Sequence, residues 1–206
     1  MHKRRNAPVI NIENTLLSAD KKHIGFGGAR GGGKSWAVRV KALLLCVAWA
    51  GIKILIVRKT YKELFNNHIA PLLVLLNGVA AYNKTDKIFT FPNGSTITFG
   101  YCANDGDLGQ YQGAEFDVWF ADEAGQFLEN WLTQIDACVR GVNDFPKRVY
   151  YTCNPGGQGH QYIKRIFIDR KYESGEDPND YSFIQSLVTD NKVLMESQPD
   201  YIKQLD

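Results

Sequence analysis

Residues 28–35, with the sequence GARGGGKS, constrain the fold of this chain more than any other segment. They match the pattern GxxxxGK[ST] in full. The segment HIGFGGA that leads into them is typical of a short buried strand, and KSWAVRVKALLLCVAWA, residues 34–50, is typical of a helix. A glycine-rich turn between a strand and a helix points backbone N–H groups, and the positive end of the helix, at a bound anion. The pattern predicts a phosphate-binding loop formed by Gly28, Ala29, Arg30, Gly31, Gly32, Gly33, Lys34 and Ser35.

The last two residues of the loop indicate which phosphates it binds. Lys34 can reach the β- and γ-phosphates of a nucleoside triphosphate as a point charge, and the Ser35 hydroxyl can be a ligand of Mg²⁺. A glycine-rich surface turn is the alternative, and the strand before and the helix after disfavour it. Arg30 is unexpected, because a loop that approaches a ligand closely rarely includes a bulky guanidinium.

A second candidate site follows the apolar segment VWFA, residues 118–121, where Asp122 and Glu123 come next. Open α/β sheets bind ligands at the carboxyl ends of their strands, the edge at which the phosphate loop also lies. Asp122 would hold Mg²⁺, directly or through water, and Glu123 would orient or deprotonate an attacking water. A surface turn or a helix start also fits two adjacent acids, but together with the phosphate loop they favour a hydrolytic site.

Strand and helix patterns alternate along the chain, which predicts an α/β fold with a mostly parallel sheet flanked by helices. The Asn93-Gly94 pair predicts an antiparallel hairpin, and Pro71 predicts a kink or break in a helix. We expect strands over 23–29, 52–59, 117–124, 148–157 and 181–191, helices over 34–50, 60–78, 128–141 and 161–172, the hairpin over 87–101 and a loop over 103–116.

Composition narrows the class of protein. The 206 residues fit one domain, and a hydrophobic fraction of 44% is that of a folded protein. A net charge of +2 gives no argument for a nucleic-acid partner. The four cysteines form no CxxC pair, which favours buried thiols in a reducing, intracellular setting over disulfides or a metal site. The longest apolar run, of 11 residues, is too short to span a membrane, and the basic start has no apolar segment behind it, so we expect no secretory signal.

A third strand end gives the most specific clue. Residues 150–157, YYTCNPGG, combine with Arg30 in the phosphate loop and with QGAEFD, residues 112–117, before the acidic strand. In this combination the chain resembles the ATPase domain of viral large terminase subunits, the motors that drive DNA into bacteriophage procapsids. The likeness extends from about residue 22 to the end of the chain. It implies a P-loop NTPase of the additional-strand (ASCE, RecA-like) type, in which the strand before Asn154 lies between the phosphate-loop strand and the acidic strand.

The resemblance also implies roles for single residues. Thr152 and Asn154 would form a coupling motif that senses the γ-phosphate, although a plain turn also explains residues 154–157. Lys34 and Arg30 would stabilise charge that develops during hydrolysis, while Glu123 prepares the water. An outward-pointing Arg30 in a salt bridge is the alternative for that residue.

The domain boundaries follow from the same likeness. We expect one ATPase domain over 1–206, with an N-terminal arm over 1–22 and a terminal segment over 185–206 that leads, in the family, to a nuclease domain. Nothing in this sequence supplies that nuclease, because a turn explains Asp105 and Asp107, the close acidic pair outside the magnesium strand. The chain ends without a helix cap or turn signal, which suggests that it was cut from a longer protein.

The identity of the base and of any arginine from a neighbouring subunit stays open. Many family members select adenine with a glutamine before the phosphate loop, but the first glutamine here is Gln110. Asn11 or Asn14 can substitute, or stacking can hold the base, so ATP is implied by the resemblance alone. Arg140 and Arg148 are candidates for an arginine that completes a neighbour's site, and a solvated charge at a helix end or a strand end is the simpler reading of each. The basic pairs 58–59, 147–148 and 164–165 fit either DNA phosphate contacts or ordinary surface.

The partners that the resemblance implies are double-stranded viral DNA, the portal and procapsid, the small terminase subunit, and further copies of the chain in a ring. We expect a monomer in isolation, located in the cytoplasm of the bacterial host, with ATP and Mg²⁺ as cofactors and no membrane contact. Two alternatives remain: a helicase-like DNA translocase, and a nucleotide-dependent switch or assembly module with little hydrolysis.

Overall fold

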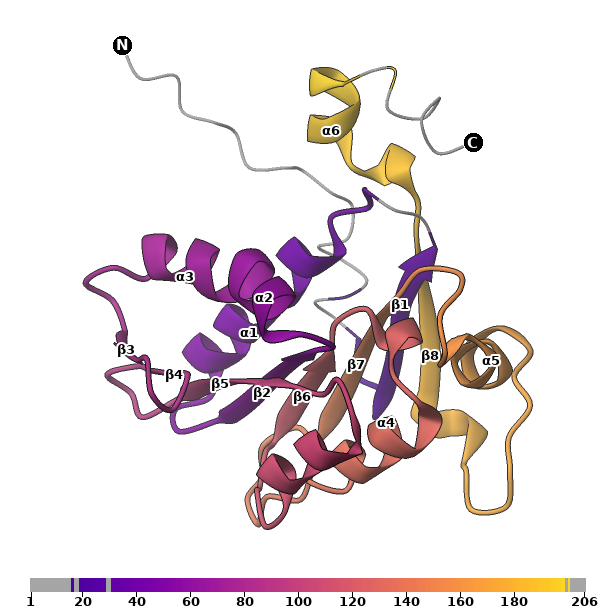
Figure 1. Ribbon diagram of the computed structural model, residues 1–206, viewed down its shortest axis with the longest axis horizontal. Coiled ribbons are helices and arrows are strands. Elements are labelled where there is room, and N and C mark those ends of the chain that lie inside the picture. The colour runs from indigo at the N-terminus through magenta and orange to yellow at the C-terminus, as the bar shows by residue number, and fades with distance from the viewer. Residues whose placement is uncertain (1–15, 17–18, 29–30, 199, 201–206) are drawn as a thin grey trace.

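A single sheet with helices on both faces forms the centre of the molecule (Figure 1). The structure, a computed structural model, describes residues 16, 19–28, 31–198 and 200. The sheet has eight strands in the order β3-β4-β5-β2-β6-β7-β1-β8. Their bounds are β1 His23–Gly28, β2 Lys53–Arg58, β3 Ala81–Asn83, β4 Ile88–Thr90, β5 Thr96–Tyr101, β6 Val118–Ala121, β7 Arg148–Cys153 and β8 Tyr181–Ser186.

The sheet is mostly parallel, as predicted. Strands β5, β2, β6, β7, β1 and β8 pair in parallel, whereas β3, β4 and β5 form antiparallel pairs. The predicted hairpin is therefore confirmed as β4 and β5, and β3 extends it by one strand. Strand β7 lies between β1 and β6, which is the order that the resemblance implies.

Apolar side chains on both faces of the central strands bury the sheet between two helical layers. Ile54 and Ile56 of β2 belong to a core with residues of α1 and α3, whereas Leu55 and Val57 face a core with residues of α4 and α5. This alternation follows from the two-residue period of a strand, and coverage of both faces explains why β2 is almost continuously apolar.

The helices are α1 Lys34–Ala48, α2 Tyr61–Leu64, η2 Phe65–Ile69, α3 Ala70–Leu75, α4 Glu129–Asp136, α5 His160–Ile163, η5 Lys164–Ile168 and α6 Lys192–Ser197, with short 3₁₀ turns at η3 Asp105–Tyr111, η4 Ala124–Gln126, η6 Pro178–Asp180 and η7 Val188–Asp190.

The helix predicted over 60–78 is interrupted rather than continuous. Pro71 has no N–H, so the carbonyl of Asn67, four residues earlier, has no helical donor. Arg39 Nη1 donates to that carbonyl instead, and the Ala70 N–H donates to Phe65 O, which gives the π-helical turn η2. The predicted break of the α-helix near Pro71 is thus confirmed, and it takes the form of a π-turn that the sequence did not indicate.

Other predicted elements differ in length. The helix expected over 128–141 ends at Asp136, because the chain turns back to form a bridge between Phe116 and Val139. The loop expected over 103–116 contains the 3₁₀ turn η3, in which Asp105 accepts a hydrogen bond from Trp131 Nε1 at 2.5 Å. The four cysteines are buried and free, as expected. No helix in the described part of the chain is long and apolar enough to cross a membrane.

Candidate nucleotide-binding and catalytic site

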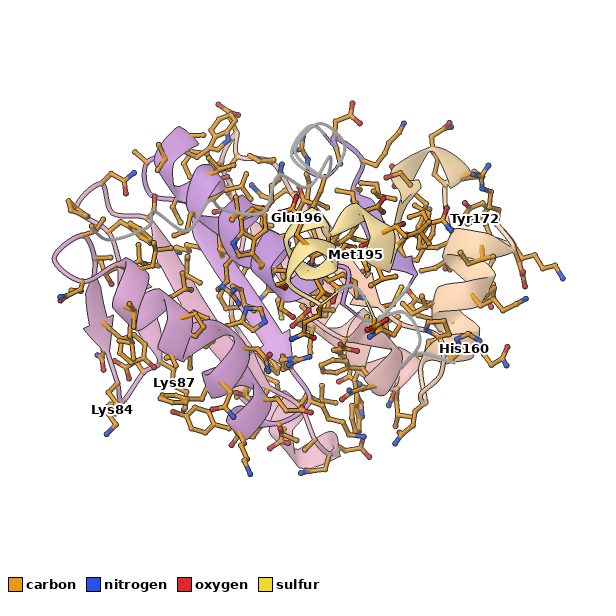
Figure 2. All side chains as sticks on the ribbon, turned by 90° about the horizontal axis from the view of Figure 1, so that it is seen from above. Lys84, Lys87, His160, Tyr172, Met195 and Glu196 are labelled. Atoms are coloured by element: carbon orange, nitrogen blue, oxygen red, sulfur yellow. The ribbon has the colours of Figure 1, made fainter. Side chains whose placement is uncertain are left out.

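The carboxyl ends of β1, β2, β6 and β7 lie at the same edge of the sheet, where a cleft of about 670 Å³ opens. Figure 2 views the molecule from above, with α6, labelled at Met195 and Glu196, over this edge. The cleft is lined by Gly31, Gly32, Gly33, Lys34 and Ser35 of the predicted phosphate loop and by Glu123 and Asn154. Residues from three separate predicted motifs therefore meet in one place.

The phosphate loop connects β1 to α1 as predicted. Gly31 and Gly33 have φ values of 80° and 72°, a region that favours glycine, and α1 begins at Lys34. Gly28 ends β1, and a Cβ there would lie 2.6 Å from the carbonyl oxygen of Ser186. Ala29 and Arg30 lie outside the described residues.

Two residues that the sequence analysis did not identify, Ser186 and Asn191, bind carbonyl oxygens of the phosphate loop. Ser186 Oγ donates to Gly32 O at 3.2 Å, and Asn191 Nδ2 donates to Gly31 O at 2.7 Å. Both bonds engage carbonyl oxygens, which would repel a phosphate. No sequence pattern marks these two residues, because they come from β8 and the start of α6, far along the chain.

Lys34 is 7% exposed at the floor of the cleft. Burial lowers the pKa of its ammonium group, and the nearby Glu123 carboxylate partly opposes that shift. A phosphate chain in the cleft would favour the charged form of Lys34 further.

Asp122 is buried and has contacts on both carboxylate oxygens. Thr152 Oγ1 donates to Oδ1 at 2.5 Å and Ser35 Oγ donates to Oδ2 at 2.9 Å. His68 Nε2 and Arg58 Nε lie 2.7 Å and 3.2 Å from Oδ2. Burial alone would raise the pKa of Asp122, but His68, Arg58 and Thr152 reverse this shift and hold the pKa well below its usual value. The carboxylate therefore stabilises the fold above its unfolded pKa of about 4, and that stability is lost as the pH falls below it.

Glu123 adopts a left-handed backbone conformation, with φ 62°, directly after β6. Its N–H donates to Thr152 Oγ1 at 2.9 Å, and Asn154 Nδ2 lies 3.1 Å from each of its carboxylate oxygens. Thr152 thus bridges the backbone of Glu123 and the side chain of Asp122. The structure brings these two predicted acids and the two predicted coupling residues into direct contact.

The turn after β7 packs backbone to backbone against the turn after β6. The Gly159 N–H donates to Gly125 O at 2.9 Å. A Cβ at Gly157 would lie 2.1 Å from Gly125 O, and one at Gly159 would lie 2.3 Å from Phe127 O. The glycines at 157 and 159 therefore let the Asn154 turn lie on the Glu123 turn.

Arg58 belongs to this site, and its assignment to a basic surface pair is wrong. Its side chain is 8% exposed, and Nη2 lies 3.5 Å from Glu123 Oε1, in addition to the contact of Nε with Asp122. Arg58 is the last residue of the apolar strand β2. Its place at the carboxyl edge of the sheet was the sequence signal that could have identified it.

We predict that Arg58→Gln destabilises the chain, because it leaves the buried Asp122 carboxylate without the neighbouring guanidinium. Breaking a buried ion pair in this way costs about 3–5 kcal/mol. Thermal or urea unfolding measures the change. Lys59→Gln, next in sequence and less buried, is the matched control and should stay within about 0.5 kcal/mol. Equal stabilities of the two variants would contradict a structural role for the Arg58 contacts.

The two arginines considered for a neighbour's site, Arg140 and Arg148, lie away from the cleft. Arg140 is exposed, and its Nη2 donates to Ala114 O at 3.5 Å, close to the start of β6. Arg148 begins β7, so both arginines lie at the edge of the sheet opposite to the cleft. Lys164 and Arg165 form ion pairs with Asp169 and Glu176.

The fold and the sequence of the phosphate loop are those of the P-loop NTPases. A family model described as phage terminase large subunit matches residues 20–206. The chain therefore belongs to the phage terminase large subunit family. No curated protein matches it.

Solved structures agree at the level of the fold. The large terminase of a thermophilic bacteriophage, in complex with ADP, superposes with a TM-score of 0.75 at 20% identity, covering 96% of this chain and 50% of that one. The large terminase ATPase domain of Thermus phage P74-26 gives a TM-score of 0.63 at 15% identity, with 91% and 83% covered. The large terminase of bacteriophage HK97 gives 0.59 at 13%, with 90% and 40% covered. The chain spans about half the length of the first of these three proteins.

Proposed function

We propose that this chain is the ATP-hydrolysing motor domain of a large terminase subunit, and that it powers the movement of DNA into a procapsid. The contact between Asn154 and the Glu123 carboxylate carries the proposal, because it joins a candidate water-activating base to the predicted coupling residue beside the phosphate loop. The large terminase of the thermophilic bacteriophage, which this chain resembles in fold, has been solved with ADP and with ATP-γ-S.

The phosphate loop, with its N–H groups and Lys34, would bind the triphosphate. Mg²⁺ fits the residues present, since it prefers one or two protein oxygens together with phosphate oxygens and water. Ser35 Oγ would be its direct ligand. Asp122, whose oxygens already accept hydrogen bonds from Ser35 and Thr152, would orient that hydroxyl and bind the ion through water. The bound ion supplies charge neutralisation on the β- and γ-phosphates.

Hydrolysis would proceed by in-line attack of water on the γ-phosphorus. The Glu123 carboxylate accepts or orients the water proton, a bond forms between the water oxygen and phosphorus, and the bond to the β,γ-bridging oxygen breaks so that its electrons leave with ADP. Lys34 and Arg30 stabilise the charge that develops on the transferred group.

Asn154 would couple this chemistry to movement. In the present structure it holds Glu123, so a γ-phosphate that competes for the Asn154 amide would release the carboxylate toward water. Loss of phosphate would restore the contact and shift the turn after β7, which packs on the turn after β6.

The remaining assignments rest on family membership. We propose ATP as the nucleotide. Asn11 and Asn14, the two candidates for contacts with the base, lie outside the described residues. We also propose that its partners are double-stranded DNA, the portal and procapsid, the small terminase subunit and further copies of the chain in a ring. We propose that it acts in the host cytoplasm. Within the ring, an arginine such as Arg140 would complete the nucleotide site of a neighbouring copy. The nuclease expected of the family would lie on the chain that follows the 185–206 segment.

Phosphate release measured with Mg²⁺ and ATP, with and without double-stranded DNA, tests the function. We expect turnover that Lys34→Ala abolishes, and we expect Arg30→Ala to lower turnover far more than ATP affinity. Equal loss of both with Arg30→Ala would show that Arg30 only binds nucleotide. Nucleotide binding without turnover in the presence of DNA would favour a switch module, and separation of DNA strands would favour a helicase.

A further inference from the structure

His68 is a buried titratable side chain that neither the phosphate loop nor the acidic strand accounts for. It has no exposed surface, and its Nε2 lies 2.7 Å from Asp122 Oδ2. Its Nδ1 has no hydrogen-bond partner among the described residues. Among the described residues, the one polar contact of the imidazole is therefore with Asp122, the candidate residue for binding Mg²⁺.

The local backbone explains how a histidine comes to point at this carboxylate. His68 lies on the π-turn η2, and such turns often occur at functional sites because they displace a side chain from its regular helical position. Pro71 and the bond from Arg39 to Asn67 O maintain the irregular turn. Leu64 and Ile69, both fully buried, anchor the segment in the core on that face of the sheet.

We propose that His68 is a positioning residue, which fixes the Asp122 carboxylate so that Asp122 can orient Ser35 toward Mg²⁺. Through this contact, the helical segment 61–75 would be connected to the nucleotide site. The inference rests on the proposed function. Asp122 Oδ2 accepts from Ser35 Oγ, and His68 Nε2 lies on the same oxygen. Without the imidazole, Oδ2 keeps only Ser35 Oγ and the longer contact to Arg58 Nε, and Thr152 holds Oδ1, so the carboxylate is held less firmly against Ser35.

The test compares two amides at this position. In His68→Gln the side-chain Nε2 can replace the imidazole donor, whereas in His68→Asn the shorter amide does not reach Asp122. Loss of a partner that orients a metal-binding residue typically costs 10–100-fold in metal affinity or activity. We expect His68→Asn to lower kcat and to raise the Mg²⁺ concentration that half-saturates ATP binding, each about tenfold, while His68→Gln stays within about threefold of wild type. ATP binding without Mg²⁺ should be the same in all three.

His23 provides the matched control. It is also a buried histidine next to an aspartate, with Nδ1 3.5 Å from Asp136 Oδ2, but it lies at the start of β1, at the opposite edge of the sheet. His23→Asn should lower thermal stability without moving the Mg²⁺ midpoint or the kcat of the folded protein.

A double variant separates a positioning role from a packing role. If His68 acts through Asp122, then His68→Asn adds little to the Mg²⁺ effect of Asp122→Asn, because interacting residues are not additive. The proposal is overturned if His68→Asn lowers stability alone, with kcat and the Mg²⁺ midpoint at wild-type values, or if the Gln and Asn variants behave alike. A wild-type chain with Mg²⁺-dependent ATP binding but no turnover would contradict the proposed hydrolysis, and the Mg²⁺ midpoints would still decide the role of His68.

Discussion

Glu123→Gln is expected to reduce phosphate release by at least about a hundredfold, the usual contribution of a general base. The amide keeps the shape of the side chain but cannot accept the water proton. Nucleotide affinity should stay within about threefold, because an interaction made only in the transition state does not contribute to ground-state binding. Stopped-time phosphate assays and equilibrium binding of labelled ATP measure the two quantities.

Glu63→Gln is the matched control for this variant. Glu63 lines the same cleft, but its carboxylate accepts from Thr60 Oγ1 at 3.0 Å rather than contacting Asn154. Turnover of Glu63→Gln should remain near that of wild type. If Glu123→Gln turned over ATP at the wild-type rate, Glu123 would not be the base and the chain would be better described as a switch module.

Gly157→Ala is expected to give the second large effect, on the contact between the turns after β6 and β7. Its Cβ would lie 2.1 Å from Gly125 O, and its φ of 91° is unfavourable for any side chain. The turns must separate, and this moves Asn154 relative to Glu123. We expect the free energy of unfolding to fall by about 1–3 kcal/mol from over-packing and by about 1–2 kcal/mol more from backbone strain.

The neighbouring glycine separates the two causes. Gly156 has a similar φ of 96°, but a Cβ there would meet nothing within 4 Å. Gly156→Ala should therefore show the backbone strain alone, with turnover reduced much less than in Gly157→Ala. Unfolding curves and phosphate release measure both variants, and equal effects in the two would show that packing of the turns is unimportant.

Much of the site was predictable because its motifs are local in sequence. The phosphate loop is contiguous, and its glycines, Lys34 and Ser35 follow from the chemistry of phosphate binding. Asp122 and Glu123 follow directly after an apolar strand, and parallel strands bring such ends to one edge. The order of the strands, with β7 between β1 and β6, came from the resemblance to terminases rather than from periodicity.

The contacts that sequence reasoning missed are distant along the chain. His68 reaches Asp122 across 54 positions, and Asn191 reaches Gly31 across 160. Only the packing of η2 on the sheet, and of α6 on the loop, creates these pairs. Arg58 was misassigned because a basic pair is usually solvent-exposed, whereas here the strand carries its first member into the site. Arg30, the most unusual residue of the loop, lies outside the described residues and stays a prediction.

A crystal structure of this chain with Mg²⁺ and a non-hydrolysable ATP analogue tests the central claim most directly. We predict that the triphosphate lies in the loop formed by residues 28–35, with Ser35 on the ion and the γ-phosphate facing Glu123, and that Asn154 has moved from the carboxylate to the phosphate. An empty cleft at saturating nucleotide, or a γ-phosphate out of reach of Glu123, would contradict it.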